Sequence, residues 1–230
     1  RKSWNPIKKL WPKPGLKVTV EVPDVYDLDL NSSGGDIYVG DIEGDVEGRS
    51  SGGDVTVEDI DGNVEVRTSG GRIEIETVAG DVSAVTSGGR IDIEEVGGAL
   101  EAQSSGGSIE IGSVNGPVRA KTSGGSIDSE DAAGAVVASP SGGGIRAHIS
   151  QQPQAESKLV SAGGSVILYL DPSVSVDLDA SSSGGRVVSE LPVRVTNFTS
   201  AKSKLDGQVN GGGPMIELRS SGGSIKILEP

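Results

Sequence analysis

Hydrophobic and polar positions alternate in short runs along most of the chain. In the five repeats from Gly34 to Gly106, the third and fifth positions after the first glycine of Ser-Gly-Gly are apolar, as at Ile91 and Ile93, with one residue between them. A second run of the same kind precedes it, with Val82 and Ala84 at its apolar positions. Alternation places successive side chains on opposite faces of a strand, so each run predicts a half-buried β-strand.

The runs recur with a fixed period of 18 residues. The first glycine of each Ser-Gly-Gly marks six consecutive intervals of this length, at Gly34, Gly52, Gly70, Gly88, Gly106, Gly124 and Gly142. A second glycine series with the same period lies ten residues later, at Gly44, Gly62, Gly80, Gly98, Gly116 and Gly134. Each repeat therefore has two corners with a short strand after each.

A parallel β-helix, or β-solenoid, explains this period. If each 18-residue unit is one coil, every strand stacks in parallel on its equivalent in the next coil at about 4.8 Å, and identical residues form ladders. Antiparallel hairpins would not repeat one residue type at one point every 18 residues. Crossovers between parallel strands favour the right-handed sense, which we expect, although 18-residue coils built of three hexapeptides can also wind left-handed.

Small polar residues accompany the corner glycines. Glycine suits a corner that needs either a positive φ or a close backbone approach. The serine before each Gly-Gly recurs as regularly, at Ser33, Ser51, Ser69, Ser87, Ser105, Ser123 and Ser141, usually after another Ser or Thr. No His or Lys recurs beside these serines to act as a base, so we interpret them as structural hydroxyls that bond along the ladder or to corner amides.

The period divides the chain into segments. Residues 1–17 form a basic leader or linker, and residues 18–230 form one solenoid domain with regular coils over 34–141 and irregular, capped C-terminal coils over 142–230. Further strands are expected at 165–170, 175–180, 214–221 and 224–230, and the insertion between Gly185 and Gly222 is expected to form an outer hairpin or flap. Alternating residues 17–22 and 26–30 are candidate capping strands for the N-terminal end, because an open solenoid end exposes strand edges.

Composition narrows the function classes. The formal net charge of -13 repels phosphate backbones, and the repeats show no basic patch, so nucleic-acid binding is not expected. The absence of cysteine excludes disulfides, thiolate metal sites and a cysteine nucleophile. The sequence has no run of about 18 apolar residues, which is the length that would indicate a membrane-spanning helix.

The leader RKSWNPIKKLWPKPGLK has the opposite charge. It holds six Lys or Arg and no acid, together with Trp4 and Trp11. One interpretation is a segment that lies near a lipid surface beside a removed signal or anchor, since the chain starts at Arg1 and not at Met. The alternative is a solvated leader packed on the first coil.

Few residues have the pattern of a catalytic or metal site. The single histidine, His148, has no cysteine or second histidine to complete a zinc site, and no GxSxG elbow is present. The GGxI segments lack the Lys-Ser/Thr of a phosphate loop. Acidic residues form columns at equivalent positions of successive coils, Glu74, Asp92, Glu110 and Asp128 in one column and Glu58, Glu76 and Glu94 in another. Either Ca²⁺ or the salt of the medium with nearby Arg72 and Arg90 would compensate them. We therefore assign no catalytic, cofactor or metal residue.

The units SGGDIYVGDIEGDV, TSGGRIEIETVAGDV and SSGGSIEIGSVNGPV, with the closing NGGGPMIELRSSGGSIKI, resemble a bacterial family of SGG-repeat domains classed as adhesins. The resemblance covers roughly residues 18–230. It implies a β-solenoid that is exported or held at the cell envelope, and it brings no catalytic residues.

Two classes of function remain. The favoured hypothesis is a non-enzymatic structural or adhesion-type module of the bacterial cell envelope or exterior, presenting a rigid acidic surface to a protein or glycan partner. The alternative is a polysaccharide hydrolase or lyase, and a further one is an acidic protein that mimics DNA. Oligomeric state is left open. A specific binding site is expected where the period breaks, on a candidate loop, unless that loop is only a cap. Its residues are Arg194, Asn197, Phe198, Lys202, Lys204 and Asp206.

Overall fold

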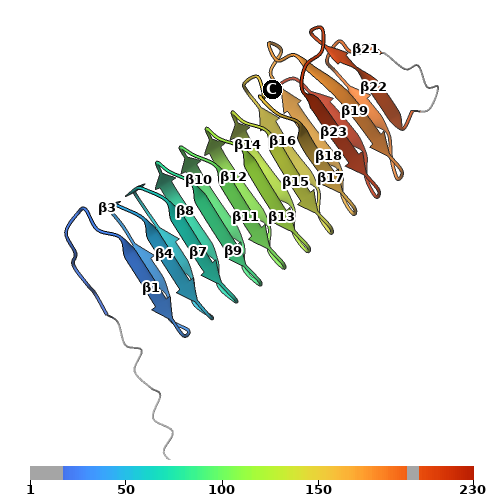
Figure 1. The fold of residues 1–230 in the computed structure, drawn as a ribbon. Coiled ribbons are helices and arrows are strands. Elements are labelled where there is room, and N and C mark those ends of the chain that lie inside the picture. Colours follow the sequence, from blue (N-terminus) through green and yellow to red (C-terminus); the bar gives the residue numbers. More distant parts are fainter. Residues whose placement is uncertain (1–17, 196–201) are drawn as a thin grey trace, which may run out of the picture.

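The fold is a rod of two parallel β-sheets that face each other across an apolar core (Figure 1). The computed structural model describes residues 18–195 and 202–230, and in this part of the chain it contains strands and no helix. The expected parallel β-solenoid is confirmed. Among the described residues there is no helix with the length and apolarity needed to cross a membrane.

Each sheet is named here by its first strand. The β1 sheet runs β1 (Leu28–Ser32), β4 (Val46–Ser50), β7 (Val64–Thr68), β9 (Val82–Thr86), β11 (Leu100–Ser104), β13 (Val118–Thr122), β15 (Val136–Pro140), β17 (Ser157–Ser161), β23 (Met215–Ser220), β19 (Val176–Ser182), β22 (Lys204–Val209), β21 (Arg194–Val195). The β2 sheet runs β2 (Ile37–Val39), β5 (Val55–Val57), β8 (Ile73–Val78), β10 (Ile91–Val96), β12 (Ile109–Val114), β14 (Ile127–Ala132), β16 (Ile145–Ile149), β18 (Val166–Leu170), β24 (Ile225–Leu228), β20 (Val187–Ser189), with β3 (Ile42–Glu43) and β6 (Ile60–Asp61) beside its first strands.

The 18-residue period is the register of both sheets. Ile91 pairs with Ile73 on one side and Ile109 on the other, and Leu100 pairs with Val118 in the opposite sheet. These inward side chains are 0–2% exposed. The predicted inward face is therefore correct, and each coil completes the core of its neighbours.

A ladder of buried hydroxyls holds the Ser-Gly-Gly corner, one position earlier in the chain than we expected. The Thr86 hydroxyl donates to the Gly71 carbonyl of the preceding coil at 2.9 Å and accepts from Gly89 N–H of its own coil at 3.2 Å. Ser50, Thr68, Ser104, Thr122, Ser161, Ser182 and Ser220 bond in the same way. Ser87 and its equivalents in the Ser-Gly-Gly are exposed.

The strands expected beyond residue 142 are present, but the last of them do not stack in chain order. Strand β23 lies between β17 and β19, and β24 lies between β18 and β20, in parallel with both neighbours in each case. The outer strands β19 and β20 therefore come earlier in the sequence than β23 and β24, which lie between them and the preceding coil. The insertion forms the expected hairpin, in which β22 pairs antiparallel with β19 and β21.

The N-terminal end has less cover than we expected. Residues 26–30 were a candidate capping strand, but β1 forms the β1-sheet strand of the first coil and pairs in parallel with β4. The other candidate, residues 17–22, forms no strand over its described part, where Val18 and Val20 are exposed. Val22, the last residue of this run, is half-buried and packs against the core, so the described residues 18–22 give the end only partial cover.

Candidate functional site: an acidic groove along the coils

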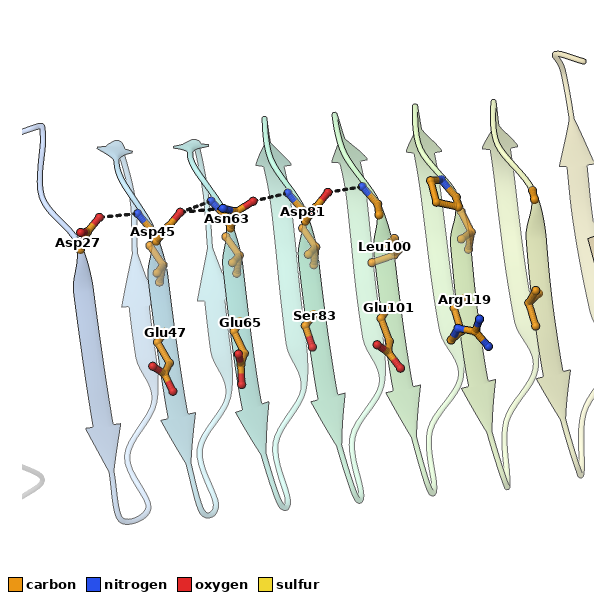
Figure 2. Close-up of a pocket in the computed structure, with 18 of the residues that line it drawn as sticks. Asp27, Asp45, Glu47, Asn63, Glu65, Asp81, Ser83, Leu100, Glu101 and Arg119 are labelled. Carbon is orange, nitrogen blue, oxygen red and sulfur yellow. Dashed lines mark hydrogen bonds between the residues drawn. The ribbon is translucent and has the colours of Figure 1, made fainter. Parts of the chain in front are cut away.

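The main hollow of the surface is a groove that crosses successive coils beside the β1 sheet (Figure 2). It has a volume of about 910 Å³, and its lining runs from Asp27 before β1 to Glu156 before β17. Eight coils contribute to it, so at about 4.8 Å a coil it is about 34 Å long. From β1 to β15 each coil adds the same kinds of position, the corner residue before the strand and the first outward residue of the strand, whereas the last coil adds Ala155 and Glu156 before β17.

The corner positions form a hydrogen-bonded row along the upper edge in Figure 2. The Asp27 carboxylate accepts from Asp45 N–H at 3.0 Å, Asp45 from Asn63 N–H at 2.8 Å, and Asn63 Oδ1 from Asp81 N–H at 2.9 Å. Asp81 ends the row by accepting from Ala99 N–H at 2.7 Å. Short polar side chains with a free acceptor are suited to this role, because each satisfies a backbone donor of the next coil. The row therefore fixes the edge of the groove rigidly.

The outward positions of the strands give the groove its charge. Its described lining residues include eight carboxylates and one arginine: Asp27, Asp29, Asp45, Glu47, Glu65, Asp81, Glu101, Glu156 and Arg119. From β13 onward the lining is mostly apolar, with Pro117, Ala135 and Val137, and it holds one base, Arg119, and one acid, Glu156. The groove is thus strongly acidic over β1 to β11 and has no excess of acid over β13 to β17.

Two arginines lie beside the outward glutamates of β4 and β7 in the groove lining. Arg49 pairs with Glu47 and lies 3.9 Å from Glu65, whose carboxylate also meets Arg67 Nε at 3.1 Å. These arginines offset part of the negative charge of Glu47 and Glu65 from outside the lining. The lining contains no histidine. The lining as a whole carries an excess of acidic groups, which attract positively charged groups.

A second acidic surface covers the β2 sheet. The predicted column Glu74, Asp92, Glu110 and Asp128 is confirmed by the strand register. Arg72 Nε lies 3.5 Å from Asp92, and Arg90 pairs with both Asp92 and Glu110, so arginines compensate this column as one alternative proposed. A hollow of about 670 Å³ lies over Gly112 between these acids. In the described part of the chain, no group of three or more His, Cys, Asp or Glu is arranged to hold a metal ion.

The second acidic column, Glu58, Glu76 and Glu94, shifts the pKa values of two ionisable groups. The hydrogen bond from the Tyr38 hydroxyl to Glu58 raises the pKa of Tyr38 to about 12. Partial desolvation, followed by the charges of Glu58 and Glu94, raises the pKa of Glu76. Like charges one coil apart therefore do repel at this column.

The candidate loop lies at the C-terminal end of the rod, away from the groove. Arg194 lies on β21, Lys204 and Asp206 lie on β22 opposite Ser181 and Asp179, and the Lys202 carbonyl accepts from Val187 N–H at 2.9 Å. Asn197 and Phe198 lie outside the described residues. The hairpin covers β19, so these residues belong to a closing element that also presents exposed basic side chains.

His148 lies on β16, half-buried on the outer face of the β2 sheet. Its Nδ1 is 3.0 Å from the Glu130 carbonyl, and its ring meets Tyr169 edge-on at 6.4 Å between centroids. It is thus packed against the sheet and not at an edge.

Comparisons of the chain with protein-family models, curated proteins and solved structures gave no match.

Proposed function

We propose that this chain is a non-enzymatic binding module of the bacterial cell envelope or exterior, and that the groove holds an extended, positively charged partner. The observation that carries the proposal is the continuity of the groove over eight coils, with the same lining positions repeated from β1 to β15. A linear partner meets such a lining repeatedly, and weak contacts along one chain add up through multivalency.

The charge of the lining selects the chemistry of the partner. Eight carboxylates and Arg119 line the groove, and Arg49 and Arg67 pair with two of the eight from outside the lining. The remaining excess of acid gives a cationic segment an electrostatic gain that a neutral glycan does not have. A lysine-rich, extended stretch of a protein fits best, with an amino-sugar polymer as the glycan counterpart. The envelope location rests on the family resemblance and on the basic leader with its two tryptophans.

Binding of a fluorescent lysine-rich peptide, measured by anisotropy, tests the proposal. Glutamines at Glu47, Glu65 and Glu101 keep the side-chain shape and remove three groove charges. We expect affinity to fall more than tenfold. The matched control changes three acids on the other sheet, Glu74→Gln, Asp92→Asn and Glu110→Gln, and we expect a loss of less than threefold.

Equal losses of affinity for both triple variants would show that peptide binding depends only on net charge. This result would reject the groove as the binding site. A parallel assay with chitosan and neutral polysaccharides, read by release of reducing ends, addresses the enzymatic alternative. Retention without cleavage is expected; turnover abolished by the groove substitutions would replace a binding module with a hydrolase.

A further inference from the structure

The large apolar side chains that are exposed lie in the first coils and the C-terminal coils of the rod. Among the described residues, the large apolar side chains that are exposed are Val18, Val20, Val25, Tyr26 and Tyr38 at the N-terminal end, and Val188, Val195 and Met215 in the C-terminal coils. Between Tyr38 and Val188 the large outward apolar side chains, such as Val137, Ile167 and Tyr169, are half-buried. Apolar groups confined to the ends of a polar rod indicate faces that meet other protein.

The two ends differ in charge. Residues 18–45 hold eight Asp or Glu and no Lys or Arg, and all eight acids are exposed. Residues 186–206 hold four bases, Arg186, Arg194, Lys202 and Lys204, against Glu190 and Asp206. The four bases are exposed as well. Two N-terminal ends would repel each other, whereas an N-terminal end and a C-terminal end attract.

Strand direction agrees with the same arrangement. From β2 to β20 every neighbouring pair on the path of the β2 sheet is parallel, and β2 and β20 are its outermost strands. A second rod placed head to tail therefore presents its β2 in parallel to β20. The bond from Val187 N–H to the Lys202 carbonyl occupies part of that edge, and the antiparallel hairpin terminates the β1 sheet, so side chains and not a full backbone ladder make the contact.

We propose that copies of this chain associate reversibly head to tail, the acidic N-terminal end of one rod on the basic C-terminal end of the next. Because the two faces differ, the contact is heterologous and generates open filaments and not closed dimers. The association depends on charge pairs at exposed faces, so it weakens as salt shortens the range of electrostatic attraction. The acidic end shares Asp27, Asp29 and Asp45 with the groove lining, so association is measured on protein without a groove ligand.

Sedimentation velocity of the full chain over a range of protein concentrations tests this. At about 10 mM salt, where the Debye length is about 30 Å, we expect species that grow with concentration beyond the dimer; at about 1 M, where it is about 3 Å, we expect the monomer. A monomer under every condition, or growth that stops at a dimer, would overturn the proposal.

Charge reversal identifies the faces. Arg194→Glu with Lys204→Glu turns residues 186–206 from a net charge of +2 to −2, so that both ends are acidic. Asp24→Lys with Glu43→Lys halves the net charge of residues 18–45, from −8 to −4. Each double variant alone should associate more than tenfold more weakly at low salt. Mixing the two should restore association, which also shows that both are folded. Failure of the mixture to associate contradicts the assigned faces.

Two further variants test whether net charge alone or the basic leader, and not the basic end of a second copy, accounts for association. Reversing Lys121 and Arg146 to Glu, away from both ends, should leave association in place, and loss would mean that net charge alone governs it. Lys8→Gln with Lys9→Gln should also leave association in place. Loss there would assign the acidic end to the basic leader and overturn the head-to-tail contact.

Discussion

Two adjacent glycines of one corner should respond in opposite ways to alanine. A Cβ on Gly71 would lie 2.0 Å from the Gly53 carbonyl oxygen of the preceding coil, whereas a Cβ on Gly70 would lie 3.6 Å from its nearest neighbour, the Gly52 oxygen. Neither corner glycine has a left-handed φ. The difference is therefore one of space alone.

The geometry sets the magnitude for Gly71→Ala. The two coils must separate locally by about 1.4 Å to reach ordinary contact at 3.4 Å. That movement strains the buried bonds of Thr68, which donates to the Gly53 carbonyl at 2.9 Å and accepts from Gly71 N–H at 3.3 Å. Overpacking costs about 1–3 kcal/mol and an unsatisfied buried group about 1–3 kcal/mol more, so we expect a loss of about 3 kcal/mol.

Thermal melts by circular dichroism measure the contrast. A loss of about 3 kcal/mol corresponds to a fall in Tm of about 6–12 °C for a domain of this size. Gly70→Ala should leave Tm unchanged or raise it slightly, since it restricts the unfolded chain and gains about 0.4–1 kcal/mol. Equal Tm values for the two variants would refute close backbone approach as the reason for the second glycine.

Three further predictions concern the core, the hydroxyl ladder and pH. Ile91→Ala should cost about 2–5 kcal/mol, because Ile91 is fully buried in mid-stack; an unchanged urea midpoint would contradict its inward position. Thr86→Val should cost about 1–3 kcal/mol by leaving the Gly71 carbonyl and Gly89 amide without their partner, while Ser87→Ala, at an exposed position, should change stability by less than about 0.5 kcal/mol. A raised pKa means that folded Glu76 favours its protonated form, so its contribution to stability is present below its ordinary pKa of 4.5 and is lost as pH rises through the folded value. Glu76→Gln should therefore raise Tm at pH 7 and have no effect on Tm at pH values below 4.5, and a gain that persists in acid would exclude charge repulsion as its cause.

The regular coils could be predicted because one residue type recurs at one point of every coil. Ile91 shares its position with Ile73 and Ile109, and this identity requires parallel stacking in register. The hydroxyl ladder was predictable too. Positions alternate along β9 from Val82, so Thr86 falls on the inward face and Ser87 does not.

The order of the last coils could not be read from the sequence. Gly184 and Gly222 mark equivalent corners, and their local patterns fit either stacking order. The antiparallel pairing of β22 with β19 requires β19 to lie outermost, and this is a tertiary preference with no 18-residue signal. The groove was not predicted from the sequence for a related reason. Its depth depends on how each corner residue and the strand after it are placed in space. The acids at Glu47, Glu65 and Glu101 were the available signal.

The insertion of β23 and β24 between earlier strands has a mechanical consequence. In a solenoid built in chain order, tension on the segment after the last strand would peel strands one at a time from a free edge. Here β24 has β18 on one side and β20 on the other, so tension applied at residues 229–230 must break two rows of backbone bonds at once. Tension at the opposite end meets β1, which has one neighbouring strand. The rod should therefore yield first at its N-terminal coil, and the C-terminal side is the firmer point from which to bear load.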